Sequence, residues 1–126
     1  NARRVSPRRK VRKMKISDIK TLLDAEVLCG EELLNTEVFS ACCSDMMSDV
    51  LAYVKDQGVL LTGLVNPQVV RTAEMMDMVC VVFVRNKRPS LEMIELAADS
   101  GIVLLATKRR AFEASGLLYS SGLGKK

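Results

Sequence analysis

The sequence predicts an α/β fold: a three-layer α/β/α sandwich built on a mostly parallel sheet of about five strands. From Gly58 onward, apolar β-branched runs alternate with helical patterns in the order strand, helix, strand, helix, strand, helix. The run from Met78 to Val84 is apolar throughout, as expected of a central parallel strand that is covered on both faces. The connections between these strands are short, which favours right-handed crossovers and therefore a parallel sheet.

Charge separates a basic tail, residues 1–13, from the rest of the 126-residue chain. The tail carries 7 of the 19 Lys and Arg residues and no acid, so residues 14–126 hold 12 basic and 15 acidic groups. We expect residues 14–126 to form a single domain. We interpret the tail as a disordered upstream extension or cloning remnant. The alternatives are a polyanion-binding arm or a phosphorylation site at Ser6.

The composition excludes several classes of function. Aromatic content is 4%, Trp is absent and residues 14–126 are acidic, so we expect no nucleic-acid binding by the folded domain. We also expect no membrane association, because no apolar run approaches the roughly 18 residues of a transmembrane helix and no signal peptide follows the basic start. Histidine, a common metal ligand and general base, is absent. We interpret the cysteines as buried free thiols of a cytoplasmic protein; they are Cys29, Cys42, Cys43 and Cys80.

The front of the domain contains a helix followed by two strands. Ser17 is a suitable N-cap, and apolar residues at helical spacing predict a helix over 17–24. A short strand is predicted over 26–29, and a second, rich in β-branched and aromatic residues, over 36–43. Because a short turn joins these two strands, we expect one of them to be antiparallel or to lie at an edge of the sheet.

A second helix is predicted to start at Ser44 and to end near residues 56–58. Ser44 would cap it, and Asp45 and Asp49 would lie in its first turns, where acids interact favourably with the helix dipole. These two acids are four residues apart and could hold a hard cation. We favour the simpler interpretation of a helix capped by Ser44 with two solvated acids in its first turns.

The remaining elements follow in regular alternation. Pro67 suits the first turn of the third helix because its missing N–H would have no partner there. Gly101 is typical of the residue that ends a helix. The predicted elements are a strand over 58–63, a helix from Asn66-Pro67, a strand over 78–84, a helix from Pro89-Ser90 to 100, a strand over 102–107 and a helix over about 111–121.

Catalytic motifs are absent from the sequence. It contains neither the G-x-x-x-x-G-K-[ST] phosphate-binding loop nor G-x-G-x-x-G, and without histidine it has no Ser-His or Cys-His pair. We therefore predict that the protein is not an enzyme and has no certain cofactor. A phosphotransfer role for Ser44 or Ser48 is the alternative.

Polar residues at the ends of the predicted strands indicate a binding site at the carboxyl edge of the sheet. Helix amides after Asn66 could meet a phosphate or carboxylate, and Gly63 allows close approach of the backbone. Arg85 and Lys87 would supply positive charge. The alternatives are that these are ordinary loop residues or that the surface mediates self-association. The candidate ligand-binding residues are Ser44, Ser48, Thr62, Gly63, Asn66, Arg85, Lys87 and Thr107.

Several segments together resemble the DRTGG domain over about residues 15–123. The stretch from Val27 to Leu34 is similar to the amino-terminal domain of HPr kinase/phosphorylase. The stretch from Ser44 to Val50 is similar to small stand-alone clostridial members of that group, often called serine-kinase-like. The segments that resemble the DRTGG domain are Leu60–Gly63, Val81–Val84, Arg88–Ser90, Glu92–Ala97, Gly101–Leu105 and Ala111–Ala114.

The chain departs from the resemblance at two loops. Leu64-Val65 stands where the family has Asp-Arg after the first Thr-Gly, and Val84-Arg85-Asn86 stands where it has Thr-Gly-Gly. If those family residues form a ligand site, this chain has a changed or lost one. The kinase domain with its phosphate-binding loop is absent, so the resemblance implies no kinase activity.

What the resemblance implies is an accessory domain, since DRTGG domains accompany CBS domains in some pyrophosphatases, occur in phosphotransacetylases and contribute to subunit association. We therefore predict a non-catalytic cytoplasmic regulatory module that forms a homodimer. It would bind an adenine nucleotide or another small anionic metabolite, dock on a partner enzyme, or do both. The alternative is a purely structural homodimerisation module without a ligand.

Overall fold

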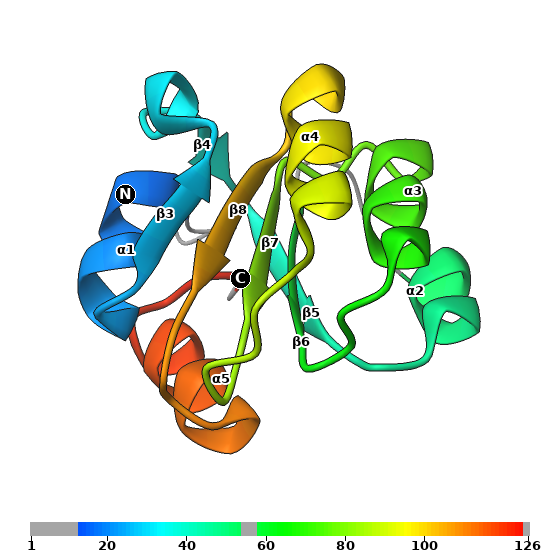
Figure 1. Ribbon diagram of the computed structural model, residues 1–126. Coiled ribbons are helices and arrows are strands. Elements are labelled where there is room, and N and C mark those ends of the chain that lie inside the picture. The colour runs from blue at the N-terminus through cyan, green and yellow to red at the C-terminus, as the bar shows by residue number, and fades with distance from the viewer. Residues whose placement is uncertain (1–12, 54–57, 125–126) are drawn as a thin grey trace.

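A five-stranded sheet forms the centre of the computed structural model, which describes residues 13–53 and 58–124 (Figure 1). The strand order is β3-β8-β7-β6-β5; β5 to β8 are parallel and β3 is antiparallel to β8. The two front strands are thus the two edges of the sheet and one is antiparallel, which confirms the expectation for them. The strands are β3 (Glu26–Cys29), β5 (Ser40–Cys43), β6 (Gly58–Thr62), β7 (Cys80–Phe83) and β8 (Val103–Ala106).

Helices cover both faces of the sheet, so the predicted three-layer sandwich is confirmed (Figure 1). The helices α1 and α5 pack on one face, and α2, α3 and α4 pack on the other. A short 3-10 helix, η2 (Glu31–Leu33), follows β3. The helices are α1 (Ile16–Leu23), α2 (Met47–Tyr53), α3 (Pro67–Met75), α4 (Leu91–Ser100) and α5 (Ala111–Ser120).

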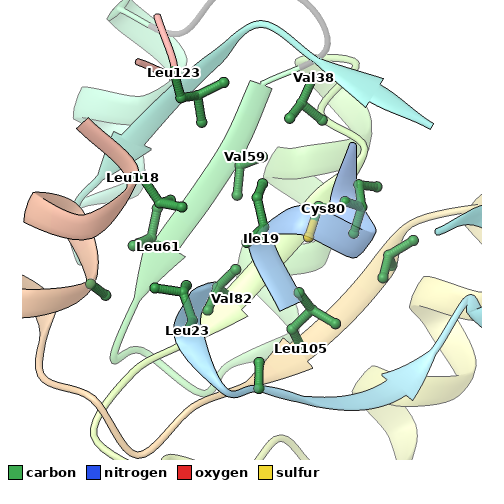
Figure 2. Close-up of a cluster of buried hydrophobic side chains, with 14 of the residues drawn as sticks. Ile19, Leu23, Val38, Val59, Leu61, Cys80, Val82, Leu105, Leu118 and Leu123 are labelled. Carbon is green, nitrogen blue, oxygen red and sulfur yellow. The ribbon is translucent and has the colours of Figure 1, made fainter. Parts of the chain in front are cut away.

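Strand residues alternate between two separate hydrophobic cores. In β6, Val59 and Leu61 face α1 and α5, whereas Leu60 faces α2, α3 and α4. Figure 2 shows the first core, where side chains of α1 and α5 meet those of the central strands. Every residue of β6, β7 and β8 is buried, which explains why their sequences are continuously apolar rather than alternating.

The predicted strand over 36–43 is wrong as a single element. Glu37–Val38 forms strand β4, which pairs antiparallel with β2 (Met14–Lys15) in a separate two-stranded sheet. Ser40–Cys43 forms β5, which pairs with β6 in the main sheet. Phe39 separates the two strands, and the pairing partner of the chain changes there. The β-branched and aromatic residues of this segment favour an extended backbone, but they do not determine which strand the segment pairs with.

Both predicted N-caps in the front half are misplaced. Helix α1 begins at Ile16 after Lys15, and the Asp18 carboxylate accepts a hydrogen bond from the Lys15 backbone N–H at 3.0 Å. Ser17 therefore lies inside the first turn. Helix α2 begins at Met47, so Ser44 precedes it by three residues. The expected helix end at residues 56–57 and the basic tail over 1–12 lie outside the described residues.

The cysteines are free thiols, as expected, but they are not all buried. Cys80 is buried in the core, where desolvation raises the pKa of its thiol. Cys29 and Cys42 are half-buried and Cys43 is exposed. Cys42 and Cys43 occupy β5, an edge strand that pairs with a neighbour on one side only. The residue types of the strand do not show that it lies at an edge. Within residues 13–53 and 58–124, no helix is long and apolar enough to cross a membrane.

Two glycines predict opposite responses to the same substitution. Gly30 has φ of +85°, and a Cβ atom there would lie 2.9 Å from the Val103 Cα atom. Gly116 lies inside α5, and a Cβ atom there would meet nothing within 4 Å. Gly30→Ala should lower the free energy of unfolding by about 2 kcal/mol or more. Gly116→Ala should raise it by up to about 1 kcal/mol. Urea unfolding monitored by circular dichroism measures both, and changes of the same sign would contradict the packing described around Gly30.

Candidate functional site

The carboxyl ends of β5, β6 and β7 and the start of α5 meet at one edge of the sheet, the lower edge in Figure 1. A recess of about 480 Å³ opens there. We call it the arginine recess. It is lined by Cys43, Ser44, Asp45, Thr62, Gly63, Val84, Arg85, Arg110, Ala111 and Phe112.

The Asp45 carboxylate joins two loops of this edge. It accepts a hydrogen bond from the Gly63 backbone N–H at 2.8 Å and another from the Thr62 hydroxyl at 2.8 Å. The Thr62 hydroxyl oxygen in turn accepts from the Leu64 N–H at 3.1 Å. The Gly63 amide, helped by the Thr62 hydroxyl and the charge of Arg85, holds the pKa of Asp45 below its usual range. The Asp45 carboxylate thus already accepts from the Thr62 hydroxyl and the Gly63 N–H, two groups that the sequence predicts as ligand-binding.

Arg85 and Asn86 form a turn with an unusual backbone. Both have φ of +57°, in the left-handed region where glycine is favoured. These are the two positions at which the resemblance places Gly-Gly. The Arg85 N–H donates to the Arg109 carbonyl oxygen and the Asn86 N–H to the Thr107 carbonyl oxygen, both at 2.8 Å. Backbone hydrogen bonds therefore fasten the turn to the loop that leads into α5.

The Arg85 guanidinium lies against Gly63, where a Cβ atom would collide with its Nη2 atom. Arg85 and Arg110 are both exposed and line the recess. Neither is in any of the ion pairs found within residues 13–53 and 58–124, although Arg85 is close enough to Asp45 to affect its pKa. The recess thus has two cationic side chains and one carboxylate, which is already hydrogen-bonded.

The N-terminus of α5 adds to the positive potential of the recess. Arg110 is the N-cap residue and its side chain makes no capping hydrogen bond. The amide groups of the first turn are therefore left for water or a ligand, and the helix dipole favours negative charge at this end. Arginine side chains and helix amides are the groups that proteins commonly use to bind phosphate and carboxylate.

A second recess, of about 610 Å³, lies beside the first along the same edge and contains Thr107. Its walls carry three acids and three bases, of which Arg88 pairs with Glu26 at 2.8 Å and Arg109 with Glu113 at 2.6 Å. The Thr107 hydroxyl donates to the Leu23 carbonyl oxygen at 2.6 Å, which ties β8 to the end of α1. Its charges are balanced, so it offers less to an anion than the arginine recess does.

The predicted site residues separate into three groups. Ser44, Thr62, Gly63 and Arg85 come together in the arginine recess, and Thr107 lies in the second recess. Asn66 caps α3 by accepting from the Gln68 N–H at 2.8 Å, and Ser48 and Lys87 are exposed and line neither recess. A ligand role for any of the eight stays a prediction.

Among the recess residues that the sequence does not predict as site residues, the most important are Asp45, Arg110 and Phe112. The sequence predicts Asp45 in the first turn of a helix, whereas α2 starts two residues later, at Met47. Arg110 ends the run Lys108-Arg109-Arg110 after a predicted strand, and that position at the carboxyl edge was a usable signal. Phe112 is 92% exposed, and an apolar residue in a helical pattern gives no sign of that. In the described part of the chain, no group of three or more Cys, Asp or Glu side chains could hold a metal ion.

Comparison with known proteins identifies the fold and the family. The model of the DRTGG domain matches residues 18–121. A similar solved structure contains the CBS and DRTGG domains of the regulatory region of a Clostridium perfringens pyrophosphatase, complexed with its activator, diadenosine tetraphosphate. The TM-score is 0.70 at 20% identity, over 87% of this chain and 48% of that one. This chain thus spans about half the length of that solved chain, and the likeness is one of fold. No curated protein matches the chain.

The Asp45 contacts predict a stability that depends on pH. Asp45→Ala should lower the free energy of unfolding by about 1–2 kcal/mol at pH 7, since two hydrogen bonds to a carboxylate are lost. Because the pKa of Asp45 is lowered by folding, this contribution is complete above the ordinary pKa of aspartate and declines as pH falls through the lowered value.

Urea unfolding of both proteins between pH 7 and pH 2 measures the effect. The difference between wild type and variant should shrink below about pH 4. Asp49→Ala, which removes an exposed acid in the first turn of α2, is the matched control. A difference that stays constant down to pH 2 would show that the Asp45 contacts do not depend on its charge.

Proposed function

The chain belongs to the DRTGG domain family, and from this membership we propose that it is a non-catalytic regulatory module that binds a small anionic ligand in the arginine recess. The observation that carries the proposal is the pairing of Arg85 and Arg110 in one recess, with neither in an ion pair among the described residues. Two guanidinium groups brought together from separate loops repel each other, and an anion between them relieves that repulsion.

A phosphate-bearing metabolite, such as an adenine nucleotide, is the ligand class that we favour. Arginine presents paired donors that match phosphate and carboxylate oxygens. The regulatory region of the clostridial pyrophosphatase, which contains both CBS and DRTGG domains, binds the polyphosphate activator diadenosine tetraphosphate. That observation concerns a protein with 20% identity, so it supports the class of ligand without placing it in this recess.

Binding would be transmitted through the two loops that hold the arginines. An anion in the recess competes with Asp45 for the charge of Arg85, whose backbone N–H is bonded to the Arg109 carbonyl oxygen. Movement of the Arg85 turn would therefore reach the start of α5 directly. A partner enzyme docked on α5 would respond to the ligand by this route.

The polar groups of the recess are poorly suited to catalysis. The Ser44 hydroxyl is held by Met46, accepting from its N–H at 2.9 Å and donating to its carbonyl oxygen at 3.3 Å. Asp45, the nearest carboxylate, has a lowered pKa and is therefore a weak base. Both facts favour a binding role over phosphotransfer through Ser44.

The second candidate function is that of a structural homodimerisation module. The observation in its favour is the exposure of Phe112 and Tyr119 on α5, at 92% and 65%. Exposed aromatic side chains are frequent at protein–protein interfaces. A dimer that forms tightly in a protein that binds no anion would support this candidate over the first.

The regulatory proposal predicts that the wild-type chain binds pyrophosphate and that Arg85→Gly weakens this binding roughly tenfold or more, because one charged donor pair is removed. Isothermal titration calorimetry measures the affinity. Glycine is the informative replacement because residue 85 has φ of +57°, so the thermal midpoint should not fall. Arg71→Ala, which removes an exposed arginine from α3, should leave the affinity unchanged.

A second variant tests whether binding depends on the position of the Arg85 guanidinium as well as on its charge. Gly63→Ala introduces a Cβ atom into the space that the Arg85 guanidinium occupies, and the flexible end of that side chain can move away. The fold should survive, and pyrophosphate affinity should change while the net charge does not. If wild type binds no anion and sedimentation shows a tight dimer, the structural candidate replaces the regulatory one.

A further inference from the structure

An apolar groove of about 510 Å³ lies next to the arginine recess, between edge strand β5 and helix α5. Leu61, Phe112, Gly116 and Tyr119 are among the residues that line it. The groove and the arginine recess share Cys43 and Phe112 as lining residues, so they lie next to each other. We propose that the ligand is a nucleotide, with its phosphates between Arg85 and Arg110 and its base in this groove. The proposal rests on the anion-binding function argued above.

The two aromatic side chains of the groove are placed as a base-binding pair. Phe112 and Tyr119 are seven residues apart in α5, so they lie on one face of the helix about two turns, or roughly 10 Å, from each other. Ser115 and Gly116 lie between them and also line the groove. A flat heterocycle over these small residues would contact an aromatic ring at each end, and aromatic rings are the side chains on which bases stack.

Gly116 has no explanation within the chain itself. Glycine inside a helix costs about 1 kcal/mol relative to alanine. A Cβ atom at residue 116 would meet nothing within 4 Å, so neither packing nor steric crowding requires a glycine there. Its φ is not positive, which removes the usual conformational reason. The open space over Gly116 leaves room for a flat molecule to approach the helix backbone closely in the groove.

The combined surface matches a nucleotide in charge and in polarity. One end has two arginines, and the other is apolar and carries no charged lining residue. A nucleotide has the same division, with anionic phosphates joined to an aromatic base. An inorganic anion or an acyl phosphate would use the arginine recess and leave the groove empty. The volumes of about 480 and 510 Å³ are each within the range of small-molecule sites.

ADP and inorganic pyrophosphate are the probes, since both present two linked phosphates and only ADP adds a ribose and a base. Titration calorimetry of the full chain without divalent cations should give a dissociation constant for ADP roughly tenfold lower than for pyrophosphate. Gly116→Leu fills the floor of the groove with a good helix former and should remove this advantage without affecting pyrophosphate. Ser120→Leu places the same side chain elsewhere on α5 and is the control. In nuclear magnetic resonance spectra, ADP should shift the Gly116 amide and pyrophosphate should not.

Each contrary outcome has a distinct meaning. Equal affinities for ADP and pyrophosphate would overturn the base site and leave the anion-binding function intact. An ADP advantage that survives Gly116→Leu would place the base outside the groove and overturn the proposal. A dimer that Gly116→Leu dissociates, with no change in ADP binding, would assign the groove to a second copy of the chain. Failure of both probes to bind wild type would remove the anion-binding function, and this inference with it.

Discussion

The site depends on one carboxylate, that of Asp45. Its hydrogen bonds to the Gly63 N–H and the Thr62 hydroxyl connect the end of β5 to the end of β6 at the edge where a ligand would enter. Without a charged acceptor, these donors would be the natural place for an anion before α3. Because Asp45 already occupies that place, the positive groups that remain available to an anion are Arg85, Arg110 and the start of α5. The Asp45 carboxylate thus determines that an anion-binding site would lie beside Arg85 and Arg110 and not at the loop before α3.

The Arg85-Asn86 turn shows how a loop can change its side chains and retain a glycine-like backbone. Its geometry is set by backbone hydrogen bonds to Arg109 and Thr107, which do not depend on the side chains present. Arg85 is held there with φ of +57° at a cost of about 1–2 kcal/mol, and Asn86 adopts the same φ at a lower cost. This backbone conformation places the Arg85 guanidinium against Gly63, beside the recess. The departure from Gly-Gly that suggests a lost site is equally consistent with a site of altered charge.

The back half of the fold was readable from the sequence because its signals are local. The runs in β6, β7 and β8 are buried on both faces, and Asn66, Ser90 and Gly101 act at helix ends as their residue types suggest. The failures occur where distant residues decide. Residues 36–43 divide between two sheets because Met14–Lys15 and β6 compete for one extended segment. The role of Asp45 depends on Thr62 and Gly63, which are 17 and 18 positions away in the sequence. A helical pattern of apolar residues likewise does not show that Phe112 faces solvent.

Helix α5 contributes residues to the surfaces of both proposed functions, so the two would compete physically. Its exposed face, marked by Phe112, Gly116 and Tyr119, lies beside the arginine recess. A base seated on that face excludes a second copy from it, and a second copy excludes the base. Any ligand that binds there therefore shifts association of the chain by its difference in affinity for the two states. If both proposals hold, dimer formation and ligand binding through α5 are linked equilibria, and measurement of the dimer at varied ligand concentration reports on both.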